Sequence, residues 1–205
     1  MTKSKGKIAA TFLTVSVAIL ILAVSVLKSA KINLAYSPMV LSESVEIENS
    51  PKIDYLLAYP GKVNPDNPLW YAKVLRDKTW LTFTFKSAKK AELNLLFADK
   101  RLGSSLILFQ NNKPDLALST LMKSAIYLET AEALMVEDAD FYNKIGLSAL
   151  KHWEVIEYEI LPITPEDLRP QVIITGNSAS EIYKKVRDHM LSKGLTPPTN
   201  PYIMR

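Results

Sequence analysis

An uncharged run of 20 residues near the start of the chain constrains its fold more than any other feature. The run begins at Ile8 and ends at Leu27, and its only polar side chains are two threonines and two serines. A helix rises about 1.5 Å per residue, so a helix over this run extends for roughly 30 Å, the thickness of a bilayer's hydrocarbon core. Threonine and serine hydroxyls can hydrogen-bond to the backbone of their own helix. The sequence therefore predicts one transmembrane helix over residues 8–27 as the chain's contact with the lipid bilayer.

The charges around this run predict its orientation. Three lysines precede it and two follow it closely, and the side of a membrane segment that carries more Lys and Arg stays in the cytoplasm. We expect residues 1–28 to form a cytoplasmic stub and anchor in a bacterial cytoplasmic membrane, with the rest of the chain outside the cytoplasm. The alternative is a cleaved signal peptide, whose apolar region is typically about 7–15 residues long. Because the run is longer and lacks a good cleavage site, we favour an uncleaved anchor.

The net charge of +4 comes from this N-terminal region. Residues 1–28 contain four lysines and no acid, which leaves 21 basic and 21 acidic side chains in the remainder. A neutral remainder lacks the electrostatic footprint of a nucleic-acid-binding protein, so we expect no nucleic-acid partner. The absence of cysteine excludes disulfides, thiolate nucleophiles and cysteine metal ligands. Nothing in the composition indicates an oligomeric state.

The rest of the sequence predicts an all-α fold in three parts. Residues 29–54 contain prolines and a Ser/Glu-rich stretch without an apolar stripe, so we expect a flexible tether. Residues 55–194 show apolar positions at helical spacing and predict a soluble antiparallel bundle of about four to five helices. Residues 195–205 are rich in proline and predict a disordered tail.

Capping residues and prolines predict where the helices begin and end. Candidate N-caps and first-turn prolines predict helices over about residues 68–81, 87–110 and 114–136. Asp138 or Asp140 is expected to cap a fourth helix, which ends before Pro162. A further helix should start at residue 165 and be interrupted at Pro170. The segment 170–193 is then either a short β-branched strand followed by a helix from Ser178, or one continuous helix. Gly194 is expected to end it.

Several short motifs resemble a family of bacterial envelope domains of unknown function. Its members carry a Y-P-G-x-x-P-D-x-P-L-Y segment in front of an all-helical region, and the similar residues here are 59–61 and 64–71. Shorter similarities follow at residues 73–77, 90–93, 98–102, 113–118, 151–155 and 165–170. The resemblance covers about residues 55–190 and implies a helical bundle behind one N-terminal membrane segment, in some members beside anti-sigma-factor modules. It favours one helix over 170–193, and it implies no activity.

Four residues are candidates for a binding site. Tyr59, Trp70 and Tyr71 could form a stacking platform for a glycan or peptide, although aromatics in a first helical turn more often hold a loop against the core. His152 lies on an apolar stripe, where a histidine bonded to a carboxylate or carbonyl is the usual arrangement. The acidic residues between 129 and 140 lack the spacing of an EF-hand, so no metal site is expected. The sequence contains no recognisable catalytic or cofactor-binding motif.

These observations favour a non-enzymatic, single-pass envelope protein whose helical domain binds or scaffolds another envelope protein or a glycan. A membrane-tethered hydrolase that uses carboxylates and His152 is one alternative, and it requires a His–acid pair in a concave pocket. An envelope-stress signalling accessory protein is the other. Its signal would have to pass through a partner, because only residues 1–7 precede the apolar run.

Overall fold

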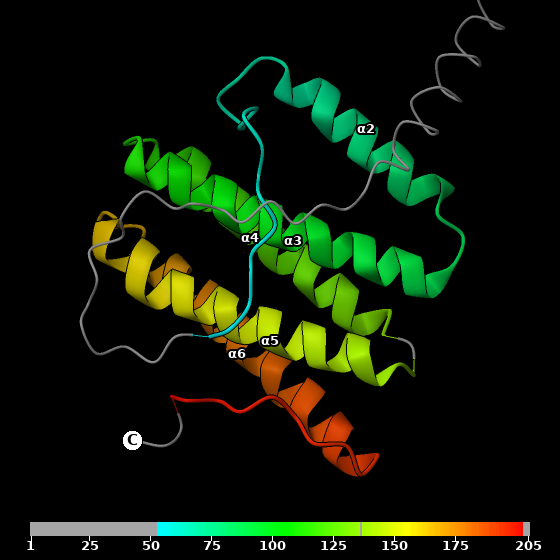
Figure 1. The fold of residues 1–205 in the computed structure, drawn as a ribbon. Coiled ribbons are helices and arrows are strands. Elements are labelled where there is room, and N and C mark those ends of the chain that lie inside the picture. The colour runs from blue at the N-terminus through cyan, green and yellow to red at the C-terminus, as the bar shows by residue number, and fades with distance from the viewer. Residues whose placement is uncertain (1–52, 136, 203–205) are drawn as a thin grey trace, which may run out of the picture. The chain divides into compact units, whose positions relative to one another are not determined.

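The computed structural model describes residues 53–135 and 137–202, and in this part of the chain it shows a helical bundle without β-strands (Figure 1). The helices in order are α2 (Trp70–Phe83), α3 (Ser87–Gln110), α4 (Pro114–Ala133), α5 (Ala139–Val155) and α6 (Arg169–Ser192). A π-helical turn, η1 (Ile156–Ile160), and a 3-10 turn, η2 (Leu161–Ile163), extend α5 toward the loop before α6. The predicted all-α class is thereby confirmed for the described residues.

Helix α3 forms the centre of the bundle because most of its circumference is covered. Leu95, Ala98 and Leu102 belong to the apolar stripe seen in the sequence, and all are buried. Phe97 lies off that stripe and is buried as well. Asn112, at φ +57°, adopts a left-handed backbone conformation that reverses the chain after α3. Helix α4 then packs back along α3, and α6 packs on both α4 and α5.

Helix α5 begins after its cap Asp138, one of the two caps between which the sequence left the choice open. The Asp138 side chain accepts hydrogen bonds from the backbone N–H groups of Asp140 and Phe141, at 3.0 and 3.3 Å. These bonds satisfy donors that have no partner within the helix. Tyr142 and Ile145 then face the core, and α5 continues without interruption into η1.

Helix α6 is one continuous helix through the segment for which the sequence left two alternatives. It begins at Arg169 with Pro170 in its first turn, where proline costs no hydrogen bond. One helix over 170–193, the alternative that the resemblance favours, is therefore confirmed. The interruption at Pro170 and the alternative helix start at Ser178 are wrong. A Cβ on Gly176 would approach Cγ2 of Ile156 to 3.1 Å, so glycine permits the close packing of α6 on η1. Packing of this kind keeps the β-branched residues 172–175 helical against their strand preference.

The end of α6 agrees with its prediction. Gly194 has φ +71°, a conformation that an L side chain rarely adopts. The Leu195 N–H donates to the Met190 carbonyl at 2.9 Å, which completes a Schellman-type C-cap.

Residues 195–202 pack against the bundle and so differ from the disordered tail that the sequence predicts. The Tyr183 hydroxyl donates to the Pro198 carbonyl at 2.7 Å, and Pro198 contacts the site of Gly146 on α5. The ring of Tyr202 lies 4.6 Å from that of Trp153 between centroids. Proline content alone does not reveal such partners, because they come from helices earlier in the chain.

The segment before α2 crosses α5 and α3 in an extended conformation (cyan in Figure 1). Its side chains Ile53, Leu57 and Ala58 are buried. The Ile53 N–H donates to Oε2 of Glu154 on α5 at 2.8 Å. We call residues 53–63 the N-terminal strap, because they fasten the start of the described chain across the bundle.

No helix within residues 53–135 and 137–202 is both long and apolar enough to cross a membrane. The predicted transmembrane run, residues 8–27, and residues 29–52 of the predicted tether lie outside the described part of the chain.

Candidate functional site

Helix α2 touches the bundle along one side only. Its buried residues are Trp70 and Asp77. Trp80 is half-buried and packs edge-on against Phe97 of α3, with ring centroids 6.4 Å apart. The remaining surface of α2 faces solvent, which makes this helix the first candidate for an interaction site.

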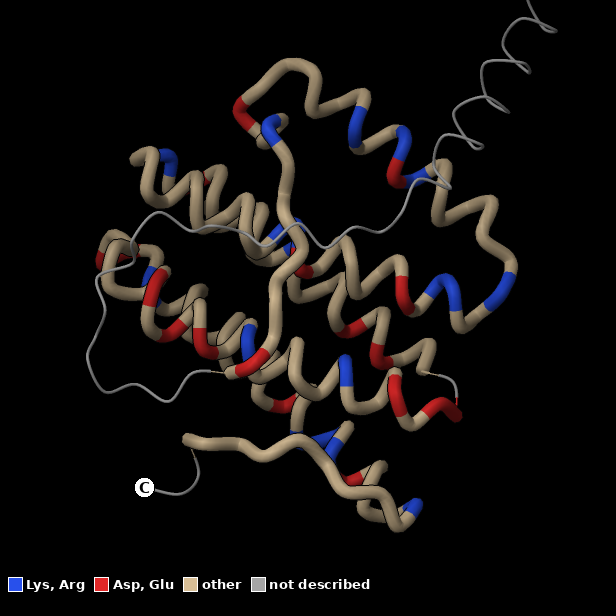
Figure 2. Tube along the Cα trace, viewed as in Figure 1, with Lys and Arg blue, Asp and Glu red and all other residues tan. Residues whose placement is uncertain are grey.

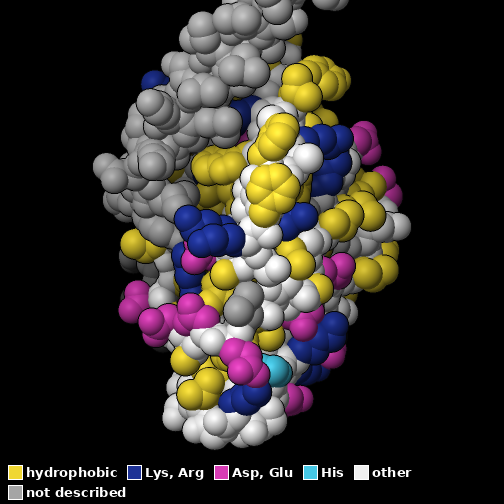
Figure 3. Space-filling view, turned by 90° about the vertical axis from the view of Figure 1, so that its right-hand side faces the viewer, with side chains coloured by type: hydrophobic (Ala, Val, Ile, Leu, Met, Phe, Trp, Pro, Cys, Tyr) yellow, Lys and Arg dark blue, Asp and Glu magenta, His cyan; other side chains and the backbone are white. Residues whose placement is uncertain are grey.

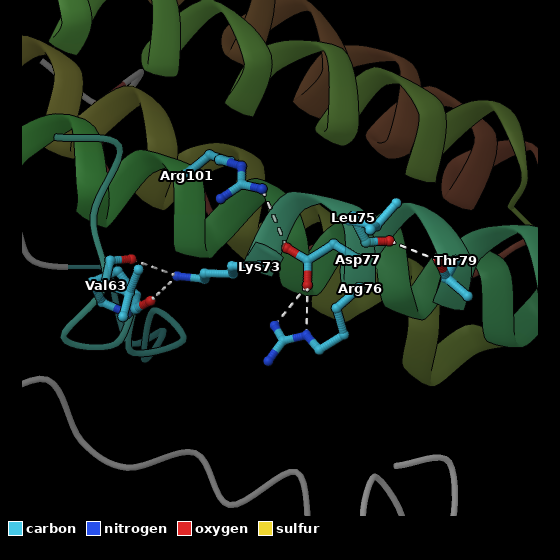
Figure 4. A network of polar contacts seen from close by, with 8 residues as sticks. Val63, Lys73, Leu75, Arg76, Asp77, Thr79 and Arg101 are labelled. Carbon is cyan, nitrogen blue, oxygen red and sulfur yellow. Dashed lines mark hydrogen bonds and ion pairs between the residues drawn. The ribbon is translucent and has the colours of Figure 1, made fainter. Parts of the chain in front are cut away.

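Two arginines enclose the only carboxylate of α2 (Figure 4). Nη2 of Arg76 lies 2.6 Å from Oδ1 of Asp77, and Nη2 of Arg101 lies 3.2 Å from Oδ2. The side chains of Asp77 and Arg101 are each 3% exposed, so the pair between α2 and α3 is buried. The Arg101 guanidinium also lies 4.1 Å from the centre of the Trp70 ring, which is cation–π geometry.

Lys73 fastens the start of α2 to the N-terminal strap. Its Nζ donates to the carbonyl oxygens of Pro60 and Val63, at 2.6 and 3.1 Å. The same Nζ lies 4.8 Å from the centre of the Trp70 ring. Trp70 is buried and two cations lie against its ring, so the ring is not free to stack on a ligand.

Positive charge accumulates in this region. Burial, followed by the charge of Arg101, lowers the pKa of Lys73 to about 8. Burial, followed by the charge of Arg76, also lowers the pKa of Lys100. Four basic side chains thus surround the single carboxylate of Asp77, which leaves a positive local charge.

The outward side of α2 and the turn after it expose large apolar side chains. Tyr71 is 80% exposed, Leu75 68% and Phe85 88%. Figure 3 shows hydrophobic and basic side chains side by side on the upper part of the molecule, and Figure 2 shows Lys and Arg along α2. We call this surface the α2 face, and it consists of Leu69, Tyr71, Leu75, Arg76, Lys78, Phe83, Phe85, Lys86 and Lys89, all exposed. Clustered exposed apolar residues mark interaction surfaces more often than scattered ones.

A second polar cluster lies inside the bundle around Asp99 of α3. Asp99 is 1% exposed and accepts hydrogen bonds from the hydroxyls of Tyr55 and Ser148, at 2.8 and 2.9 Å. Its Oδ1 also lies 3.0 Å from Nε2 of His152. The other ring nitrogen, Nδ1, lies 3.5 Å from Oγ of Ser124. A serine, a histidine and an aspartate therefore follow one another in the order of a hydrolase triad, but with the two ring nitrogens of the histidine exchanged.

The closed core around this trio does not favour catalysis. Ser124 is 1% exposed and His152 2%, and the small pocket beside them has no room for a water molecule. The Ser124 hydroxyl donates to the Ala98 carbonyl at 2.8 Å, so its proton is directed away from the histidine. A nucleophile needs both a base to activate it and access for its substrate. His152 is here a core residue bonded to a carboxylate.

The acidic residues near the turn before α5 do not converge on one point. Glu129 accepts a hydrogen bond from Ser178 at 2.7 Å, Glu137 pairs with Lys193, and Asp138 caps α5. Among the residues that the structure describes, no group of three or more His, Asp or Glu side chains could hold a metal ion.

The structure does not bring together the four candidate residues that the sequence predicts. Tyr59 is 43% exposed and Tyr71 80%, whereas Trp70 and His152 are buried. Trp70 and Tyr71 point in different directions because successive helical residues differ by about 100°, so one is buried and the other exposed. Leu75 and the basic residues were missed. One signal could have found them: residues 69–90 hold six basic residues and a single acid.

The comparisons with known proteins give a family and no activity. Residues 62–165, about half of the 205-residue chain, match the model of a family described as Domain of unknown function (DUF5667). The match includes α2 to α5 and both polar clusters except for Tyr55 and Pro60. No curated protein and no solved structure matches the chain.

Proposed function

This chain belongs to the DUF5667 family of domains of unknown function, and from that premise we propose that it is a non-enzymatic, single-pass membrane protein of a bacterial envelope. Residues 8–27 anchor it in the cytoplasmic membrane with the N-terminus inside. The helical domain lies outside the cytoplasm and binds or scaffolds another envelope component.

The α2 face is the observation that supports a binding role. Five of the thirteen large hydrophobic residues that are exposed in the described part of the chain lie between residues 69 and 85. Removing such side chains from water is favourable by about 25 cal/mol per Å² of apolar area. A partner that covers Tyr71 and Leu75 therefore gains affinity from surface that the folded domain leaves unused.

No specific observation favours the hydrolase alternative. The described residues contain one ion pair between a histidine and a carboxylate, which joins His152 to Asp99. It lies in a closed core. A signalling accessory role would use the same surface for binding, and no separate feature of the described residues supports it.

Membrane topology tests the anchor directly. We expect the full chain to stay in the membrane pellet through alkaline carbonate washing. A protease added outside spheroplasts should cut within residues 29–52 and release the domain. Extraction by carbonate, or protection of the domain until the membrane is broken, would contradict the proposal.

Photo-crosslinking tests the binding surface in native membranes. The chain has no cysteine, so a Thr82→Cys variant carries a single thiol-directed photo-crosslinker on the exposed side of α2. An Asn177→Cys variant places the same probe on an exposed position of α6. We expect adducts with envelope components at residue 82 and few at residue 177. Equal labelling at the two positions would argue against a binding role for α2.

A further inference from the structure

We propose that the α2 face docks on the anionic lipid surface of the membrane that anchors the chain. This inference deepens the proposed function by naming the partner of the α2 face, and it rests on the anchor proposed above. In this arrangement the domain lies on the membrane surface instead of standing away from it.

The geometry of α2 matches a helix that lies flat in a lipid interface. Tyr71, Leu75, Lys78 and Thr82 follow one another at intervals of four, three and four residues, so they share one side of the helix. Trp70 and Asp77 point away from this row and are buried against the bundle. Interfacial helices combine an apolar strip with lysines and arginines that remain in the headgroup layer.

Aromatic side chains extend this surface past the end of α2. Phe83 is 61% exposed and Phe85 88%. The backbone reaches Thr84 in an extended conformation, so Phe85 projects from the turn instead of from the helix. Aromatic rings of this kind insert at the boundary between headgroups and acyl chains.

The charge of the region is complementary to anionic lipid. Residues 69–90 carry six basic side chains and one acid, a net charge of 6 − 1 = +5. The single acid, Asp77, is already paired with two arginines inside the fold. Among the described residues, Lys78, Lys86 and Lys89 form no ion pair. These lysines are therefore available to anionic headgroups, each of which attracts a nearby basic residue.

A lipid bilayer fits both the positive charge and the exposed apolar side chains of the α2 face, whereas a second copy of the chain or a soluble polyanion fits only one of them. A second copy of the chain would bring two faces of +5 together, which costs energy. A soluble polyanion would satisfy the lysines but leave Tyr71, Leu75 and Phe85 in water. A bilayer supplies negative charge and an apolar layer within a few ångströms of each other.

Because the domain is tethered to the membrane, even a weak affinity of the α2 face for lipid is sufficient for docking. If the tether predicted from the sequence is a coil of about 25 residues, it spans roughly 25–30 Å and keeps an anchored domain close to the headgroups. Docking then becomes an intramolecular step at a high effective concentration.

A fluorescent probe on the full chain tests the docking. We would attach an environment-sensitive dye to Thr82→Cys and, as the control, to Asn177→Cys. Each protein is reconstituted into vesicles of phosphatidylcholine alone or of phosphatidylcholine and phosphatidylglycerol in equal parts. We expect a blue shift at residue 82 only in the anionic vesicles, and no shift at residue 177. High salt should reverse the shift by screening the lysines.

Two pairs of substitutions separate the contribution of the lysines to docking from that of the exposed apolar side chains. Lys78→Glu and Lys86→Glu should each lower the docked-to-free ratio by at least about five-fold, the effect of losing one basic residue near an anionic surface. Phe85→Ser should also weaken docking, whereas Ile126→Ser, which changes an exposed apolar residue of α4, should not. Circular dichroism confirms that each variant remains folded.

Three outcomes would overturn the docking proposal, and a fourth would overturn only the anchor on which it rests. An unshifted probe on anionic vesicles removes lipid as the partner. An equal shift with soluble polyglutamate points to an acidic macromolecule. The probe could instead be shielded already in detergent and become exposed when Glu43→Gln and Glu46→Gln are combined. That result would show that the tether covers α2 in place of lipid. A salt-sensitive shift in a chain that carbonate extracts contradicts the anchor and leaves the docking intact.

Discussion

Asp77 and Asp99 show how two buried carboxylates on neighbouring helices acquire different roles. Asp77 is held by Arg76 and Arg101, and its charge joins α2 to α3. Asp99 is surrounded by uncharged hydroxyls and an imidazole, which come from the N-terminal strap and from α5. A buried carboxylate is stable only when hydrogen bonds replace its lost water. Each aspartate therefore fixes the position of the elements that supply its partners.

The Asp99→Ala variant should be strongly destabilised. The change leaves the Tyr55 and Ser148 hydroxyls and the His152 ring without their buried acceptor. We expect the free energy of unfolding to fall by about 3–5 kcal/mol, measured by urea denaturation. Asp167→Ala, at an exposed position, should change it by less than about 0.5 kcal/mol. Equal effects of the two variants would show that the buried cluster contributes nothing to stability.

Lys73 should titrate at about pH 8 in the folded chain because burial and Arg101 lower its pKa. Its unfolded value is the ordinary 10.5, so the unfolded chain binds more protons between about pH 8 and pH 10.5. The contribution of Lys73 to the free energy of unfolding is therefore lowest below pH 8 and rises through this window. Lysine ¹³Cε chemical shifts measure the titration, and Lys73→Met identifies the signal. A Lys73 signal that moves only near pH 10.5 would contradict the prediction.

At the scale of elements, the close packing of α6 on η1 depends on one missing side chain. Gly176 lies in the middle of α6, where glycine costs about 1 kcal/mol relative to alanine. Its position is explained by Ile156, whose Cγ2 would lie 3.1 Å from an added Cβ. Glycine lowers the local stability of α6, but it allows α6 and η1 to approach each other closely.

The Gly176→Leu variant should destabilise the fold by about 1–3 kcal/mol, because the larger side chain overpacks against Ile156. Asn177→Leu places the same side chain one residue later, on the exposed side of α6. It should change the free energy of unfolding by no more than about 0.5 kcal/mol. Urea denaturation of both variants gives the comparison. A Gly176→Leu protein as stable as the wild type would show that α6 and η1 can separate without cost.

At the scale of the whole molecule, the N-terminal strap joins helices that are distant in sequence. Ile53 is bonded to Glu154, Tyr55 to Asp99, and Lys73 to two strap carbonyls. The strap thereby contacts α5, α3 and α2 in turn. A force on the chain before residue 53 would act on the core of the bundle through these bonds.

Truncation should show that the strap is part of the domain. A chain beginning at residue 53 keeps the buried side chains Ile53 and Leu57, whereas one beginning at residue 64 loses them. Each is worth about 1.5–3 kcal/mol when buried. Since single domains are stable by only about 5–15 kcal/mol, the shorter chain should unfold at much lower urea. Similar urea midpoints for the two chains would contradict a structural role for the strap.

The candidate surface was only partly predictable from the sequence. Tyr71 was selected as an exposed aromatic, but it was grouped with Trp70, which the fold buries beside Arg101. Which of two neighbouring aromatics faces inward depends on how α2 is rotated on α3. That rotation is set by Asp77 and Arg101, which are 24 residues apart, and no local pattern reports it.

The sequence by itself determined the helical class and most helix ends, because caps and apolar spacing act over three or four residues. Asp138 and Gly194 were recognisable for that reason. Only the tertiary structure decided that α6 continues through Gly176, that residues 195–202 dock on the bundle, and that His152 meets Asp99. These outcomes depend on partners that are far apart along the chain, and their contacts exist only once the bundle has assembled.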